Sequence, residues 1–131
     1  MKTGKHRKRA SQFKEVIEML KIKSASKYHI EVQHLSGELV RENAKAFQDK
    51  VIDLARQNNW HVILDLWDLE FMDSRGIAAL LEVHKKIQDQ DGTLELVNLN
   101  PAIKRVIDTV FKASVFNILP SLDKYFHAAA S

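Results

Sequence analysis

The apolar run Val62–Leu66 is the feature that most limits how this chain can fold. Its sequence, VILDL, is apolar at four of five positions and lacks the strict alternation of a strand with one face in water. Such a strand is typical of the centre of a parallel sheet that is covered on both faces. Parallel strands need crossover connections, and helical patterns lie on both sides of this run. We therefore expect an α/β domain with a mostly parallel sheet.

Apolar residues recur at helical spacing in several segments around this strand. We expect helices from about Val40 to Gln57, from Ser74 to about Gln90, and from Pro101 to Val110. Asn100 is expected to cap the third helix, because proline is favoured at the first helical position. Residues 11–18 fit either a short amphipathic helix or coil, and Pro120 is expected to open a last short helix.

The other strands are predicted from alternating or short apolar runs. We expect them over residues 18–23, 28–35, 93–99 and 116–119. The first two are expected to pair as an antiparallel hairpin with its turn at 24–27. Residues 36–38 are expected to break the second strand, and residues 71–73 to form a loop. The predicted fold is one α/β domain whose mixed, mostly parallel sheet begins with an antiparallel hairpin and carries packed helices.

The charge of the chain is concentrated at its start. Six of its 20 Lys and Arg residues precede the first acid, Glu15, which leaves 14 basic and 17 acidic residues for the rest. We expect residues 1–14 to form a basic, disordered arm and residues 15–131 to form the domain. No Phe, Tyr or Trp lies between Lys2 and Arg9, so base stacking lacks support and no direct nucleic-acid binding is expected.

Several classes of protein are excluded or disfavoured by the residue content. The absence of cysteine excludes disulfides, thiolate nucleophiles and Cys-based metal sites. The apolar stretches are too short for a membrane span, and no secretory signal is present, so a cytoplasmic protein is expected. The six histidines show no metal-ligand spacing, and no phosphate-binding glycine loop occurs. We therefore expect no enzyme activity, catalytic residue, cofactor or metal.

The segment Asp73-Ser74-Arg75-Gly76-Ile77 lies where a central strand passes into a helix. In open α/β sheets, functional groups gather beyond the carboxyl ends of the strands. Ser74 has two compatible interpretations: a helix cap, or a functional serine whose phosphate a helix N-terminus would tolerate. Arg75 would add a charge-assisted contact to such a phosphate, whereas Asp73 would oppose it.

Four segments resemble the STAS domain family, and within it the bacterial anti-sigma factor antagonists. They are Ser36-Gly37-Glu38-Leu39, the stretch from Val62 to Ile77, Gly92–Val97, and Pro101–Ile107. They occur in the family's order, and the resemblance covers about residues 18 to 120. The chain differs from many antagonists at Arg75, where a second Ser or Thr is common, and at Val40-Arg41, where acidic or polar residues are more usual.

The resemblance implies a function and a set of site residues. Ser74 matches the serine that a partner anti-sigma factor phosphorylates as its kinase, and the unmodified form binds that partner and frees the sigma factor. A phosphatase would restore the unmodified form. The partner surface implied is Asp73, Ser74, Arg75, Gly76 and Ile77, with Gly37 and Glu38, in a monomer or weak homodimer. The alternative is a STAS scaffold or subunit of a stressosome or lipid-transport type of complex, in which Ser74 is only a cap.

A rival interpretation is a receiver domain phosphorylated on Asp65. Such domains need Mg²⁺ held by an acidic pair after the first strand and a lysine after a later one, and the chain offers neither at those places. We expect Asp65 to brace its strand end instead. Trp60 and Trp67 are expected to pack in the core or at its rim, and His84 to be a partly buried structural residue.

Overall fold

The computed structural model describes residues 19–27, 30–111 and 115–123. The expected basic arm, the ambiguous segment 11–18 and most of the last predicted helix lie outside the described residues. The described elements are β1 (Leu20–Lys27), β2 (Ile30–Leu39), α2 (Arg41–Gln57), β3 (His61–Met72), α3 (Ser74–Asp89), β4 (Thr93–Val97), α4 (Pro101–Val110) and β5 (Asn117–Leu119).

The sheet has five strands in the order β1-β2-β3-β4-β5. β1 and β2 pair antiparallel, from Leu20 opposite Gly37 to Lys27 opposite Ile30. The pairs β2–β3, β3–β4 and β4–β5 are all parallel. The predicted α/β fold, with a mostly parallel sheet and an antiparallel hairpin at its start, is therefore confirmed.

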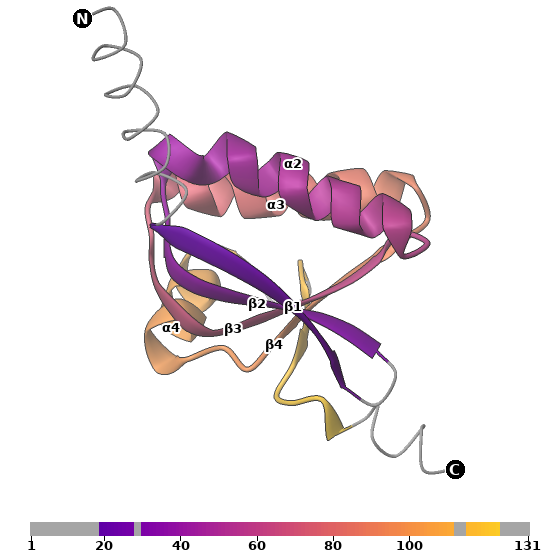
Figure 1. Cartoon of the computed structure of the whole chain (residues 1–131). Helices are drawn as coiled ribbons and strands as arrows, with labels where there is room; N and C mark the ends of the chain where they lie inside the picture. The colour runs from indigo at the N-terminus through magenta and orange to yellow at the C-terminus, as the bar shows by residue number, and fades with distance from the viewer. Residues whose placement is uncertain (1–18, 28–29, 112–114, 124–131) are drawn as a thin grey trace, which may run out of the picture.

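Helices α2 and α3 lie side by side over one face of the sheet, and α4 lies apart from them (Figure 1). The main core lies under the two helices and includes Phe47, Val51, Leu64, Leu80 and Val83. A smaller cluster, Val32, Ile63, Val97 and Leu122, covers the opposite face. The Val62–Leu66 run is buried throughout, because β3 is central and both of its faces are covered.

The hairpin was predicted with its turn at the wrong place and with its second strand ending too early. Residues 24–27 belong to β1, and residues 36–38 continue β2 instead of breaking it. The second error arises at Gly37, whose φ of 99° lets the strand continue through an irregularity in its pairing with β3. A Cβ atom there would lie 2.0 Å from the Met19 carbonyl oxygen, to which the Glu38 N–H donates at 2.7 Å.

β3 is longer than predicted, because residues 67–72 continue it through the expected loop. Its pairing with β2 shifts twice, between Asp65 and Asp68 and again between Leu69 and Phe71. Such bulges turn side chains away from the strand's regular alternation. Trp67 is 58% exposed and Phe71 51% exposed, so the prediction of core or rim packing is wrong for Trp67.

The three predicted helices are confirmed to within a residue or two. Asn100 caps α4 as expected, since its Oδ1 accepts a hydrogen bond from the Ile103 N–H at 3.0 Å. β4 ends at Val97, two residues early, where Asn98 takes a positive φ of 54°. His84 on α3 is buried, with its ring 4.9 Å from that of Phe116. Burial lowers the pKa of His84, which agrees with the expected structural role.

Candidate functional site

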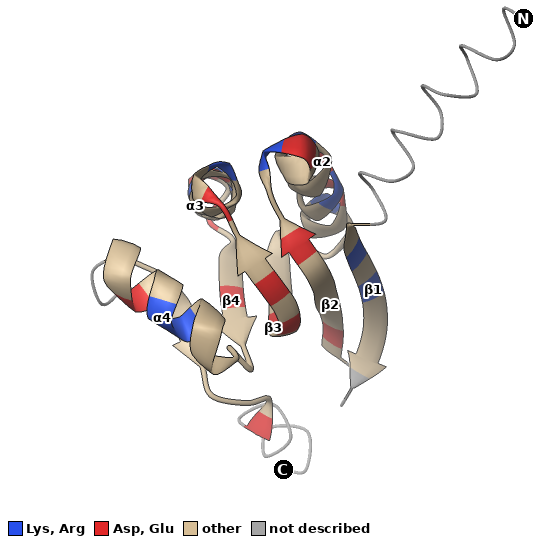
Figure 2. Cartoon of the chain, turned by 90° about the vertical axis from the view of Figure 1, so that its left-hand side faces the viewer, with Lys and Arg blue, Asp and Glu red and all other residues tan. Residues whose placement is uncertain are grey.

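Asp73 joins the start of α3 to the start of α2. Its Oδ1 accepts a hydrogen bond from the Gly76 N–H at 2.8 Å, and its Oδ2 accepts one from the Arg41 N–H at 2.9 Å. The Asp73 N–H donates to the Leu39 carbonyl at 3.3 Å. Figure 2 shows the two helix starts next to one another above the ends of β2 and β3. One carboxylate therefore forms hydrogen bonds with the first turns of both helices.

Of the two interpretations of Ser74, the helix cap is wrong, because the cap of α3 is Asp73. Ser74 is the first residue of the helix, and its side chain is exposed. Asp73 is better placed because one of its oxygens reaches the N–H of Gly76, three residues on, while the other reaches α2. Among the described residues, the Ser74 hydroxyl has no hydrogen-bond partner.

The environment of Asp73 favours its ionised form. Burial by itself would raise the pKa of this carboxyl group. The backbone N–H groups of Arg41, Gly76 and Arg75, together with the Arg75 charge, outweigh burial and lower the pKa below the usual 3.8. Asp73 is thus a carboxylate at neutral pH, which is the form that accepts these bonds best.

Asp73→Ala is expected to destabilise the fold by about 2 kcal/mol, since it removes a helix cap and the acceptor of the Arg41 N–H. The pKa of Asp73 is lower in the folded state than in the unfolded chain, so its contribution is complete above about pH 4 and is lost as the pH falls through the folded value. Urea unfolding at pH 7 and pH 3 would measure this. A difference between wild type and variant that is equally large at both pH values would contradict the assignment.

The structure brings most of the predicted site residues together. Glu38 pairs with Phe71 on β3, and Gly76 packs against the Leu39 backbone, so the Gly37–Glu38 segment adjoins the start of α3. Gly76 is buried and Ile77 is half-buried against the core. These two residues position the surface, whereas Ser74 and Arg75 are exposed on it.

Sequence reasoning did not place Arg41 in the site. Its backbone binds Asp73, and its side chain lines a groove between α2 and α3 together with Lys45 and Arg75. The only hint in the sequence was that Arg41 and Arg75 both depart from the usual pattern of the antagonists. No local pattern connects two residues that far apart, because they meet only when α2 and α3 pack together.

Asp65 braces the end of the regular part of β3, as expected. Its Oδ1 accepts from the Trp67 N–H at 3.0 Å, and its Oδ2 lies 3.1 Å from Asn98 Nδ2 and 3.0 Å from His34 Nδ1. The carboxylate is buried and has three partners. Its contacts are those of a structural residue.

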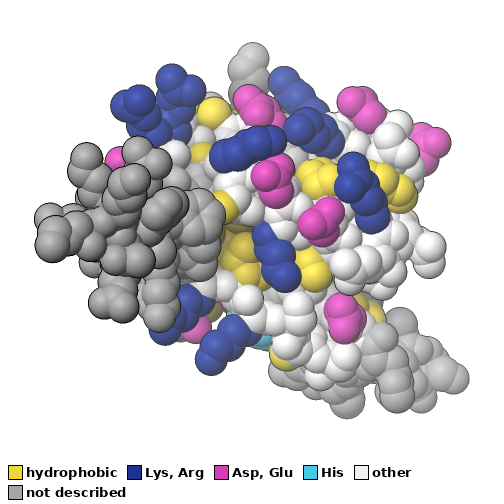
Figure 3. All heavy atoms as spheres, turned by 45° about the horizontal axis from the view of Figure 1, so that its top comes forward, with side chains coloured by type: hydrophobic (Ala, Val, Ile, Leu, Met, Phe, Trp, Pro, Cys, Tyr) yellow, Lys and Arg dark blue, Asp and Glu magenta, His cyan; other side chains and the backbone are white. Residues whose placement is uncertain are grey.

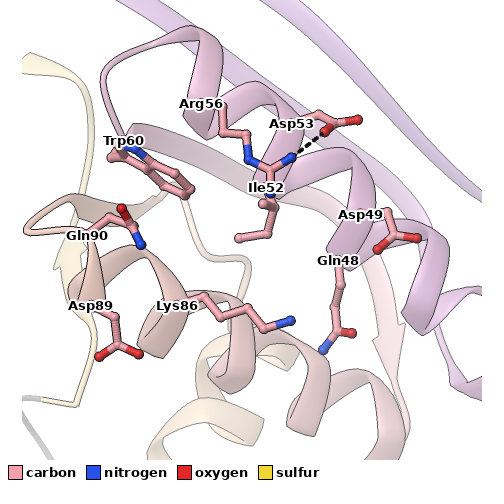
Figure 4. Close-up of a pocket in the computed structure, with 9 residues that line it drawn as sticks. All are labelled: Gln48, Asp49, Ile52, Asp53, Arg56, Trp60, Lys86, Asp89 and Gln90. Carbon is pink, nitrogen blue, oxygen red and sulfur yellow. Dashed lines mark hydrogen bonds and ion pairs between the residues drawn. The ribbon is translucent and has the colours of Figure 1, made fainter.

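A larger hollow of about 610 Å³ lies toward the far ends of α2 and α3, away from Ser74 (Figure 4). Trp60 lines it and also packs against the core, as predicted. The polar side chains around it carry mixed charges: Asp49, Asp53, Arg56, Lys86 and Asp89. Arg56 is paired with Asp53 at 3.5 Å, so the hollow shows no clear charge preference for a ligand.

The described part of the chain has neither a metal-binding cluster nor a membrane-spanning helix. It contains no group of three or more His, Cys, Asp or Glu side chains arranged to hold a metal ion. Among its helices, none has the length and apolarity needed to cross a membrane.

Comparison with known proteins shows the family. The sequence matches the profile of the STAS domain over residues 12–125. The chain belongs to the STAS domain family. This STAS chain is 29% identical over 98 residues to the anti-sigma F factor antagonist of Paenibacillus polymyxa, a match that covers 74% of this chain and 81% of that protein.

Solved STAS structures share the fold. An anti-sigma factor antagonist from Mycobacterium paratuberculosis superposes with a TM-score of 0.68 at 22% identity, covering 86% of this chain and 95% of that one. The Bacillus cell fate determinant SpoIIAA, in its phosphorylated form, superposes with a TM-score of 0.59 at 18% identity, covering 83% and 98%. At these identities, the likeness concerns the fold.

Proposed function

We propose that this protein is an anti-sigma factor antagonist whose binding is switched at Ser74. Unmodified, it would bind an anti-sigma factor that is also a serine kinase, in the cytoplasm, and so free a sigma factor. The kinase would transfer the γ-phosphoryl group of ATP to the Ser74 Oγ: the new O–P bond forms, the bond to ADP breaks, and the hydroxyl proton is released. A phosphatase would hydrolyse the ester to serine and inorganic phosphate.

The observation that carries the proposal is that Ser74 is exposed and does not cap its helix. It is exposed at the first position of α3, and Asp73 performs the capping that would otherwise occupy a serine hydroxyl. The capping role that the scaffold or subunit alternative gives to Ser74 therefore belongs to Asp73. The named relatives add weight, since one is an anti-sigma F factor antagonist and a structural neighbour was solved in a phosphorylated form.

The proposed partner surface is Asp73–Ile77 with Gly37 and Glu38. Phosphorylation would add about −1.5 to −2 charges and a hydrated group to this surface. A partner that packs closely over Ser74 would have to bury that dianion, which costs several kcal/mol unless the partner supplies matching cations. Release of the partner follows from this cost.

The test uses the anti-sigma factor kinase encoded nearest to this protein. Mass spectrometry after incubation with the kinase and ATP should place one phosphate on Ser74 and none on Ser74→Ala. In calorimetric titrations, Ser74→Asp should bind at least about 100-fold more weakly than wild type, or roughly 3 kcal/mol. Ser74→Ala should retain affinity, because it keeps the surface neutral.

Ala102→Asp is the matched control, since it places the same charge on an exposed residue in the first turn of α4. It should bind like wild type. Equal affinity of Ser74→Asp and wild type, or phosphate on another residue only, would contradict the proposed switch.

A further inference from the structure

The groove beside Ser74 is rich in cations. It lies between the N-terminal halves of α2 and α3, has a volume of about 320 Å³, and has Arg41, Lys45 and Arg75 among its lining residues. Glu82 is its one acidic lining residue, and Ala44, Ala78 and Ala79 provide small side chains. Figure 3 shows the face that these helices present, on which Lys and Arg side chains lie among Asp and Glu side chains.

The three cations differ in their partners. Lys45 is paired with Asp49 at 3.0 Å on the same helix. The guanidinium groups of Arg41 and Arg75 form no ion pair or hydrogen bond with any residue that the structure describes, and both side chains are exposed. Two unpaired guanidinium groups on adjacent helices therefore line one groove.

Asp73 connects the two helix starts that carry the arginines. Its carboxylate accepts a hydrogen bond from the backbone N–H of Arg41, so the start of α2 is tied to the residue that precedes Ser74 and Arg75. Arg75 follows Ser74 directly in α3, and Arg41 is the first residue of α2. Ser74 therefore adjoins Arg75 in the chain and follows the carboxylate that binds the Arg41 backbone.

We propose that a phosphate group on Ser74 is bound within the same chain by Arg41 and Arg75, at the mouth of the groove between α2 and α3. This inference rests on the proposed modification of Ser74. A guanidinium group presents paired N–H donors that match phosphate oxygens, and two such groups line this groove.

This arrangement refines the switch. In the unmodified protein, Arg41 and Arg75 are available to acidic groups of a partner. In the phosphorylated protein both arginines bind the phosphate. The partner then loses two cationic contacts, and the phosphate blocks its access to the groove. Phosphorylation then weakens partner binding in two ways: it adds negative charge, and it occupies the two arginines that would otherwise bind acidic groups of the partner.

The test uses the full chain with phosphoserine incorporated at position 74 during translation, which requires no kinase. The phosphorus NMR signal is titrated from pH 4 to 9 at low salt. The midpoint for wild type should lie about one pH unit below that of the double variant Arg41→Gln/Arg75→Gln, because nearby cations favour the dianion. Each single variant should move the midpoint part of the way.

Lys85→Gln is the matched control, because it removes an exposed cation of α3 that does not line the groove. It should leave the midpoint unchanged. Equal midpoints for wild type and the double variant would overturn the inference, and so would an effect of Arg75→Gln without any effect of Arg41→Gln. Absence of kinase-dependent phosphate on Ser74 would contradict the proposed function instead, so the two failures are distinguishable.

Discussion

Gly76→Ala is expected to destabilise the fold by about 3 kcal/mol, although alanine normally favours a helix over glycine by about 1 kcal/mol. A Cβ atom at this position would lie 2.0 Å from the Leu39 carbonyl oxygen and 2.8 Å from the carbonyl carbon. Backbone atoms cannot rotate away as a side chain does, so α3 would have to move from the end of β2. The displacement would also strain the Asp73 bond to the Leu39 carbonyl.

Chemical denaturation of wild type and variant measures this loss in the free energy of unfolding. In thermal unfolding, the melting temperature of the variant should be lower by roughly 10 °C. Ala78→Gly is the control on the same helix, because it lies at an exposed position and should cost only about 1 kcal/mol. A Gly76→Ala variant as stable as wild type would mean that α3 does not need its close approach to Leu39. Loss of partner binding should accompany the loss of stability, since the same displacement moves Ser74.

Asn100→Asp is expected to destabilise the fold by about 3 kcal/mol at pH 7. The Nδ2 group of Asn100 lies 3.2, 2.9 and 2.7 Å from the carbonyl oxygens of Leu66, Trp67 and Leu69. This side chain therefore provides hydrogen-bond donors for backbone carbonyl groups in the irregular part of β3. The aspartate variant keeps the oxygen that caps α4 but replaces the donor with an acceptor that faces three acceptors.

The pH dependence separates this effect from a general loss of packing. The carbonyl oxygens disfavour the aspartate anion, so its pKa in the folded variant should be above that in the unfolded chain. The penalty should therefore be largest at neutral pH and should decrease toward pH 4, where the protonated carboxyl again donates a hydrogen bond. Asn117→Asp, at an exposed position of β5, should change stability little. A penalty for Asn100→Asp that is independent of pH would contradict this explanation.

The helices were predictable because their signals are local. Apolar spacing marks the buried face of α3, and the Asn100-Pro101 pair marks the start of α4 within two residues of sequence. The strands were predicted less well, since their ends depend on pairing. β2 continues through Gly37 because a neighbouring strand and Met19 provide hydrogen bonds there. β3 continues to Met72 because β2 accompanies it through two irregularities.

The candidate site was chosen from the sequence, whereas the contacts within it were not predicted. The passage from β3 into α3 was identified from the motif around Ser74, and Gly37 and Glu38 were correctly expected to adjoin it. The cap was assigned one residue too late. Serine and aspartate are both good caps, so the choice depended on the second oxygen of Asp73, which binds α2.

The sequence by itself determined the class of fold, the helices, the family and the serine at the start of α3, since each depends on neighbouring residues or on a continuous motif. Only the tertiary structure decided that Asp73 frees the Ser74 hydroxyl, that Gly76 must lack a side chain, and that Arg41 and Arg75 line one groove. These features need atoms from distant segments within a few ångströms of each other, and the packing of α2 and α3 on the sheet supplies that proximity.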